Sequence, residues 1–215
     1  MKHRTAGLLL TFLALSAGFT GVAGQGLTAR VAPLATAMRW SPETGLENAS
    51  FFGGAATLGF GRYVSLQSSY RTAAGFATSF GDSGYSGTDN SLDASIFATD
   101  VQLRLGSGRI APVLLGGGGI VHLQPDGRES VRQIMANYGA GVDARVNSWL
   151  DAQFLVRDHR LRLDRSTLAS GSMAPADPDA SSMRQSLSVS ASLGARVGGT
   201  RSSVANRIDQ DVGAA

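Results

Sequence analysis

The feature that most restricts the fold of this chain is a set of short stretches in which apolar and polar residues alternate one by one. The clearest stretch covers residues 186–197. One set of alternate positions is apolar and comprises Leu187, Val189, Ala191, Leu193, Ala195 and Val197, whereas the other is mostly serine and comprises Ser186, Ser188, Ser190, Ser192, Gly194 and Arg196. Successive side chains of a β-strand point to opposite faces, so this pattern predicts a strand with one apolar and one polar face.

Seven further stretches of similar length predict seven more strands. Four of them alternate clearly and cover residues 62–72, 97–105, 137–146 and 149–157. Three alternate less clearly and cover residues 27–40, 51–61 and 110–123, the last two being rich in glycine. In the first of these three, Pro33 cannot donate a ladder hydrogen bond, so we expect a bulge or irregular pairing there.

The connections between these stretches are short and long in turn. Tight turns at residues 61–62, 106–108 and 147–148 alternate with longer polar segments at residues 41–50, 75–91, 124–130 and 163–184. Outer-membrane barrels alternate short periplasmic turns with longer external loops, and their strands need about 9–11 residues to cross the bilayer at a tilt. The pattern therefore predicts an all-β fold, an eight-stranded antiparallel up-and-down transmembrane β-barrel over residues 25–197.

The N-terminal residues have the composition of an export signal. A basic start at residues 2–4 is followed by an apolar run at residues 6–17 and by small residues at 22–24. These are the parts of a secretory signal, and the apolar run is shorter than the roughly 20 residues of a membrane-spanning helix. We therefore expect a cleaved signal peptide at residues 1–24 and, after the barrel, a short disordered periplasmic tail at residues 198–215.

The charge balance gives no sign of a nucleic-acid partner. Without Lys2 and Arg4, which lie in the export signal, the 19 basic residues fall to 17, against 16 acidic residues. No lysine remains, so arginine supplies all of these cations. The chain also contains no cysteine, which excludes a lipoprotein anchor, disulfides and thiol chemistry.

A soluble barrel with an apolar ligand cavity would show the same alternation with its faces reversed. Its water-facing side would carry many lysine and glutamate side chains, whereas the polar positions here are mostly small, as the narrow interior of an eight-stranded barrel requires. Aromatic residues also gather near the predicted strand ends, where membrane barrels carry interfacial girdles. These residues are Phe60, Tyr63 and Trp149 near turns, and Trp40, Phe51 and Phe52 near a loop. We favour the membrane barrel and keep a soluble periplasmic lipocalin-like ligand-binding barrel as an alternative.

Several segments carry a family resemblance. They are the hairpin at residues 59–66, the glycine-rich stretch at 111–119, the segment at 137–142, and the pairs Trp149-Leu150 and Val156-Arg157. Together they resemble the OmpA-like outer-membrane β-barrel family of small eight-stranded porin-like proteins, over about residues 27–197. The resemblance implies this fold, an outer-membrane location and no catalytic residues. Two features depart from the family. Such barrels usually end on a C-terminal aromatic, whereas this chain continues past Val197 to Ala215. The extension is also too short for the peptidoglycan-binding domain of larger relatives.

Charged residues on the predicted polar faces point to a network inside the barrel. They are Arg71, Asp100, Arg104, Asp143, Arg145, Asp151 and Arg157. Charges in a narrow barrel must be paired or hydrated, because an isolated buried charge is very costly. The two signs are nearly balanced, so the network either fills and stabilises the lumen or gates a small pore. We expect a non-catalytic outer-membrane protein with an envelope-structural, surface-interaction or small-pore role.

An enzyme that modifies lipid A is the competing class. A deacylase would need Ser, His and an acid that converge near the outer leaflet. His122 and His159 lie near external strand ends, and Asp158 adjoins His159, but neither histidine is followed by a serine two residues later. We therefore expect no enzyme activity, no metal and no cofactor.

The external end of the barrel offers surfaces for partners. The charged strand end at residues 157–165 contains four arginines, Arg157, Arg160, Arg162 and Arg165. The fork of an arginine donates two parallel hydrogen bonds to phosphate, so we expect these residues to form a rim that contacts lipopolysaccharide and outer-membrane lipids. Loops 75–91 and 163–184 are expected to meet an extracellular partner, with the barrel itself a monomer.

Overall fold

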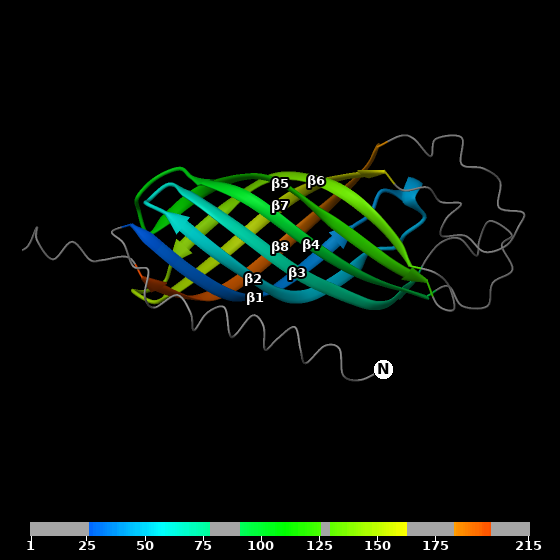
Figure 1. Cartoon of the computed structure of the whole chain (residues 1–215), viewed down its shortest axis with the longest axis horizontal. Coiled ribbons are helices and arrows are strands. Elements are labelled where there is room, and N and C mark those ends of the chain that lie inside the picture. The colour runs from blue at the N-terminus through cyan, green and yellow to red at the C-terminus, as the bar shows by residue number, and fades with distance from the viewer. Residues whose placement is uncertain (1–25, 78–90, 126–129, 163–182, 199–215) are drawn as a thin grey trace, which may run out of the picture.

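The strands of this chain close into a barrel in the computed structural model, which describes residues 26–77, 91–125, 130–162 and 183–198 (Figure 1). Within these residues the strands are β1 (Leu27–Arg39), β2 (Ala49–Phe60), β3 (Val64–Ala77), β4 (Ser91–Arg104), β5 (Ile110–Pro125), β6 (Val131–Arg145), β7 (Leu150–Arg162) and β8 (Met183–Gly198). Each strand pairs antiparallel with the next, and β8 pairs with β1. The eight described strands thus form the closed up-and-down barrel that the alternation predicts. Among the described residues, no helix is long and apolar enough to cross a membrane.

The strands extend further at the loop end of the barrel than the sequence pattern predicts. β3 continues to Ala77 and β7 to Arg162, whereas β4 starts at Ser91 and β6 at Val131. Backbone pairing continues there although the outward side chains become polar, since ladder hydrogen bonds do not require an apolar outer face. The expected signal peptide at residues 1–24 and the tail after Gly198 lie outside the described residues.

The one irregularity of register between described strands is not at Pro33. The β1–β2 register runs unbroken through Pro33 and Gly54. The β1–β8 ladder is interrupted at Ala32 and Pro33, but its register is the same on both sides of the gap. The expected bulge at Pro33 is therefore absent, and the irregular pairing is limited to a gap in the β1–β8 ladder, where the proline nitrogen has no hydrogen to donate. A register shift lies instead between Ala73 and Phe76 of the β3–β4 pair, where Gly75 has a φ of 63° that favours glycine.

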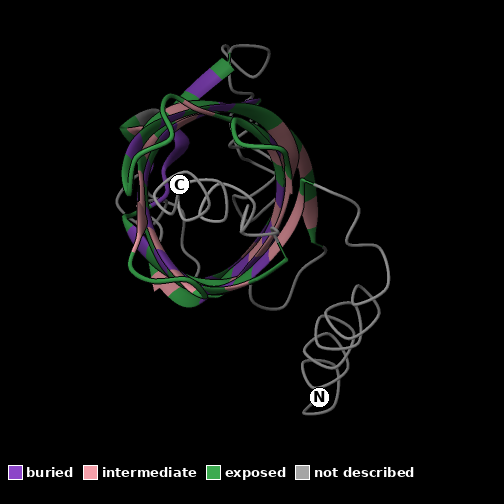
Figure 2. Ribbon diagram, turned by 90° about the vertical axis from the view of Figure 1, so that its left-hand side faces the viewer, coloured by how far each residue is buried: buried purple, intermediate pink, exposed green. Residues whose placement is uncertain are grey.

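Along the clearly alternating strands the outward side chains are mostly apolar, and the inward side chains of the middle and the turn end are mostly polar. On β8, Val189 and Leu193 are 37% and 51% exposed, whereas Ser188 and Ser190 are fully buried. Figure 2 shows the barrel end-on as a closed ring with this pattern around its wall. A continuous apolar outer surface is suited to lipid and would be costly in water. The soluble lipocalin-like alternative requires the opposite arrangement and is wrong.

The aromatic residues divide between the outer surface and the interior. Phe60, Tyr63 and Trp149 at the turn end, and Phe52 at the loop end, are more than half exposed. They have the positions expected of aromatic girdles. Two girdle predictions are wrong: Trp40 and Phe51 are fully buried. Phe51 and Phe52 are adjacent in a strand, so only one of them can face outward.

Candidate functional site

The interior of the barrel has three layers along its axis. An apolar layer lies at the loop end, a polar layer lies in the middle, and an open cavity, the vestibule, lies at the end of the short turns. Among the described residues, the first two layers fill the lumen with side chains, and the third is an open cavity.

The apolar layer is a cluster of buried side chains contributed by seven strands and the β1–β2 connection. It comprises Met38, Trp40, Leu46, Ala49, Phe51, Ala73, Leu92, Ala94, Ile96, Ala98, Val121, Leu123, Met135 and Leu161. Phe51 lies at its centre, with ring centroids 6.5 Å from Trp40 and 6.3 Å from Phe76. Because such packing excludes water, this layer closes the loop end of the lumen to hydrated solutes.

At the centre of the polar layer, Arg157 of β7 joins other strands across the lumen. Its Nη2 lies 3.3 Å from Asp100 Oδ2 of β4 and donates a 2.8 Å hydrogen bond to Gln67 Oε1 of β3. Its Nη1 donates to Ser190 Oγ of β8 at 3.1 Å, and Asn137 donates to the other carboxylate oxygen of Asp100. All five side chains are at most 2% exposed, so this ion pair is sealed from water.

Further contacts of the polar layer cross between β3 or β4 and β7. Arg71 Nη2 lies 3.5 Å from His159 Nε2, which is 2.8 Å from Ser188 Oγ. Gln153 Nε2 donates to Gln102 Oε1 at 3.1 Å. Since β7 is a neighbour of neither β3 nor β4, these side chains meet in the middle of the lumen and block it.

A glycine of β5 makes room for the central carboxylate. A Cβ atom on Gly117 would lie 2.6 Å from Asp100 Oδ1 and 2.1 Å from the carbonyl oxygen of Thr99. The glycine-rich run of β5 thus lets the wall of the barrel approach the buried ion pair.

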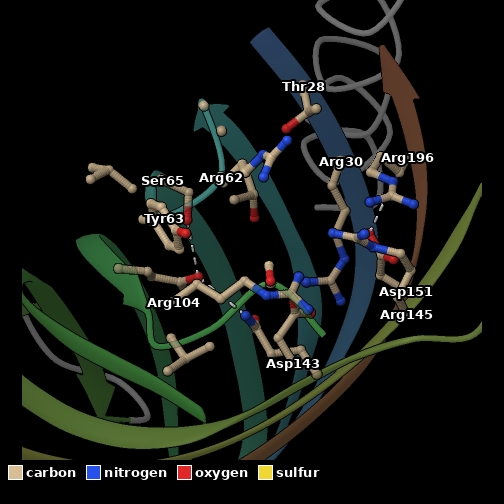
Figure 3. Close-up of a pocket in the computed structure, with 18 of the residues that line it drawn as sticks. Thr28, Arg30, Arg62, Tyr63, Ser65, Arg104, Asp143, Arg145, Asp151 and Arg196 are labelled. Atoms are coloured by element: carbon tan, nitrogen blue, oxygen red, sulfur yellow. Dashed lines mark hydrogen bonds and ion pairs between the residues drawn. The ribbon is translucent and has the colours of Figure 1, made fainter. Parts of the chain in front are cut away.

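The vestibule is a cavity of about 790 Å³ that opens between the turns (Figure 3). Arg104 Nη1 lies 2.8 Å from Asp143 Oδ2, and Arg196 Nε lies 3.4 Å from Asp151 Oδ2. Arg30 donates a 2.8 Å hydrogen bond to Ser192 Oγ. Strands β1, β4, β6, β7 and β8 therefore each bring a charged side chain to this cavity.

The seven charged residues expected in the lumen are divided between two layers. Arg71, Asp100 and Arg157 belong to the polar layer, whereas Arg104, Asp143, Arg145 and Asp151 line the vestibule. Arg71 forms no ion pair with any carboxylate of the described residues and lies against His159 instead. The predicted network does not include the inward residues Arg30, Gln67, Asn137, Ser188, Ser190 and Arg196. The alternation places all of them except Arg30 on the polar face of their strands.

The described residues of the predicted rim do not all face outward. Arg157 is 1% exposed and faces inward, so its assignment to a lipid-contacting rim is wrong. Arg160 faces outward and donates hydrogen bonds to Asp158 Oδ2 at 3.2 Å and to Tyr138 Oη at 3.1 Å. Arg162 is exposed at the end of β7, and Arg165 lies outside the described residues.

The histidines do not meet the requirements of a lipid A deacylase. His159 and Ser188 are hydrogen-bonded, but both are fully buried in the polar layer. Asp158 faces outward on the same strand, and His159 Nδ1 has no hydrogen-bond partner among the described residues, so no acid completes a triad. His122 is at the loop end of β5, on the outer face. Nowhere in the described part of the chain do three His, Cys, Asp or Glu side chains gather as metal ligands.

The barrel is similar to solved outer-membrane barrels. The crystal structure of the N-terminal β-barrel domain of Pseudomonas aeruginosa OprF matches with a TM-score of 0.53 and 12% identity, over 81% of this chain and 99% of that chain. Neisserial surface protein A matches with a TM-score of 0.48 and 12% identity, over 80% and 97% of the two chains. Ail, the attachment invasion locus protein of Yersinia pestis, matches with a TM-score of 0.43 and 11% identity, over 81% and 100%.

The likeness to the OprF barrel confirms the predicted fold, that of the small OmpA-like outer-membrane barrels. No protein-family model matches the chain, and no curated protein matches it in sequence.

Proposed function

We propose that this chain is a monomeric, non-catalytic outer-membrane barrel with a closed lumen. Its role is structural and interactive: the barrel holds its external loops and the turn end at fixed places on the two sides of the membrane. The observation that carries this proposal is the pair of stacked layers, apolar and then polar, whose side chains meet across the lumen. Among the three roles that the sequence leaves open, these layers favour envelope structure and surface interaction over a small pore.

The purified protein reconstituted in a planar bilayer tests the closed lumen. We expect no discrete conductance steps, because an ion would have to cross an apolar layer and displace a buried ion pair. Steps that change in size when Arg71 is replaced by glutamine would contradict the proposal, since they would show that the polar layer lines an open route. The proposal that the barrel is not an enzyme is tested by mass spectrometry of lipid A from cells that overproduce the protein. We expect lipid A of unchanged mass, and the loss of an acyl chain would identify an enzyme.

The external rim is proposed to contact the phosphates of lipopolysaccharide. Arg39, Arg132 and Arg162 are exposed on the outer face at the loop ends of β1, β6 and β7, and Arg160 is 36% exposed in its side chain. Together they present cations to the level of the outer-leaflet headgroups, where bidentate arginine–phosphate contacts are favourable.

Replacement of Arg132 and Arg162 by glutamine should lower the amount of lipopolysaccharide that copurifies with the barrel by more than half. The same change at Arg62, which lies in a turn at the opposite end, is the control. Equal lipopolysaccharide in all three proteins would refute the rim.

A further inference from the structure

The vestibule is lined by more positive than negative side chains. Its arginines are Arg30, Arg62, Arg104, Arg109, Arg145 and Arg196, and its carboxylates are Asp143 and Asp151. Arg104 and Arg196 each have a carboxylate within 4 Å. The other four have none among the described residues, so the cavity carries an excess of four positive charges. An overall charge near neutrality therefore conceals a strongly cationic site at the turn end.

The excess cations include a buried guanidinium with an unused donor. Arg30 is only 7% exposed, and while its Nη2 donates to Ser192 Oγ at 2.8 Å, its Nε has no hydrogen-bond partner. Nε of Arg104 and Nε of Arg145 are buried and unpartnered as well. Figure 3 shows Arg30 and Arg104 extending from different strands toward the same space. Because these nitrogens have almost no surface open to the cavity, an anion there would be attracted by the delocalised charge of the guanidinium groups and would not bond to Nε itself.

We propose that the vestibule is a binding site for a small multivalent oxyanion, a ligand that carries two or more phosphate groups and enters from the turn end. Arginine forks match phosphate oxygens in pairs, and here they come from β1, β6 and two turns, so a single ligand would meet several of them. The cavity volume of about 790 Å³ lies in the range of small-molecule sites, about 300–1,000 Å³. The polar layer closes the inner end of the vestibule, so the ligand is held there and does not pass through the barrel. This inference is independent of the proposed role of the loop end.

Calorimetric titration of the full chain in non-ionic detergent with sodium triphosphate tests the site. We expect saturable binding of one triphosphate per barrel that weakens as salt is added. Arg30→Gln and Arg145→Gln should each weaken binding about tenfold, the usual effect of losing a charge-assisted hydrogen bond. Arg62→Gln, in an exposed turn that does not support the barrel, should weaken it by a smaller factor and keeps the test valid if a lumen variant fails to fold. Arg39→Gln removes a cation of the proposed lipopolysaccharide rim at the opposite end, so it separates that surface from the vestibule, and binding of triphosphate to the vestibule should be unchanged in it.

Three results would overturn the proposal. One is the absence of triphosphate binding in the full chain, and another is an equal loss of binding in Arg39→Gln, which would indicate general attraction to the surface. The third comes from removing residues 199–215, whose charged residues are Arg201, Arg207, Asp209 and Asp211: binding that appears only after this deletion would assign the vestibule to the chain's own C-terminal segment. Unchanged binding after the deletion, together with much weaker binding of sulfate than of triphosphate, would support a free multivalent ligand.

Discussion

Replacement of Asp100 by alanine is expected to destabilise the barrel by about 3–5 kcal/mol, the usual cost of removing one partner of a buried ion pair. Asp100 is the carboxylate that lies 3.3 Å from Arg157, and both side chains are at most 1% exposed. Its loss would leave the guanidinium groups of Arg157 and Arg71 buried with no carboxylate among the described residues of the polar layer. Asn137 would lose its acceptor at the same time.

The measurement is urea-induced unfolding of the barrel in lipid vesicles, followed by tryptophan fluorescence. Asp93→Asn is the matched control, because Asp93 is an exposed residue of the same strand and the amide can still accept the hydrogen bond from Gly75 N. We expect that control to change the free energy of unfolding by less than about 0.5 kcal/mol. The double variant Asp100→Asn/Arg157→Gln should cost less than Asp100→Ala, since it leaves one guanidinium, that of Arg71, without a carboxylate in the polar layer instead of two. A loss below about 1 kcal/mol in Asp100→Ala would show that water reaches the polar layer.

Val189→Arg is expected to cost about 2–4 kcal/mol in a bilayer, the penalty of an arginine on the lipid face at the midplane. Val189 faces outward near the middle of β8, with apolar neighbours on both adjacent strands. The physical reason is the transfer of a guanidinium from water to hydrocarbon, which local thinning of the bilayer relieves only in part.

Met183→Arg provides the control for depth. Met183 faces outward at the loop end of the same strand, so the same charge there should cost only about 0–1 kcal/mol. Urea unfolding in vesicles gives both values. Equal and small costs at the two positions would mean that the outer face of β8 is not immersed in lipid, and the membrane orientation would have to be abandoned.

The alternation of polarity predicts the eight strands and the faces of those that alternate clearly, because a period of two assigns every residue of a strand to one side. It places Arg71, Asp100 and Arg157 on the polar face of their strands, but it does not predict which side chains they contact. Gln67 meets Arg157, and Arg71 meets His159, only because the closed barrel brings β3 opposite β7. That relation depends on strand number and stagger, which no local pattern encodes.

The apolar layer was missed for a different reason. Leu92, Ala94 and Ile96 face inward at the loop end of β4 and alternate with the outward residues Asp93 and Ser95. The polarity of the two faces is therefore reversed there, and a rule that assigns polar residues to the lumen leaves residues 92–96 outside both the predicted loop and the predicted strand. Trp40 and Phe51 are assigned to a girdle because they lie near a loop, whereas they are buried in the apolar layer. The reversed alternation of residues 92–96 is the available signal for an apolar plug.

The accessibility of single cysteines in the lumen distinguishes a lumen that is closed next to an open vestibule from a continuous pore. The chain contains no cysteine, so each variant carries one thiol only. Ser190→Cys lies in the polar layer at a position that is 1% exposed, and Ser65→Cys lines the vestibule. With a membrane-impermeant thiol reagent on both sides of a vesicle membrane, we expect Ser65→Cys to react and Ser190→Cys to remain unmodified until the barrel is unfolded. Rapid modification of Ser190→Cys in the folded barrel would reveal a water-filled route through the polar layer and would contradict the account.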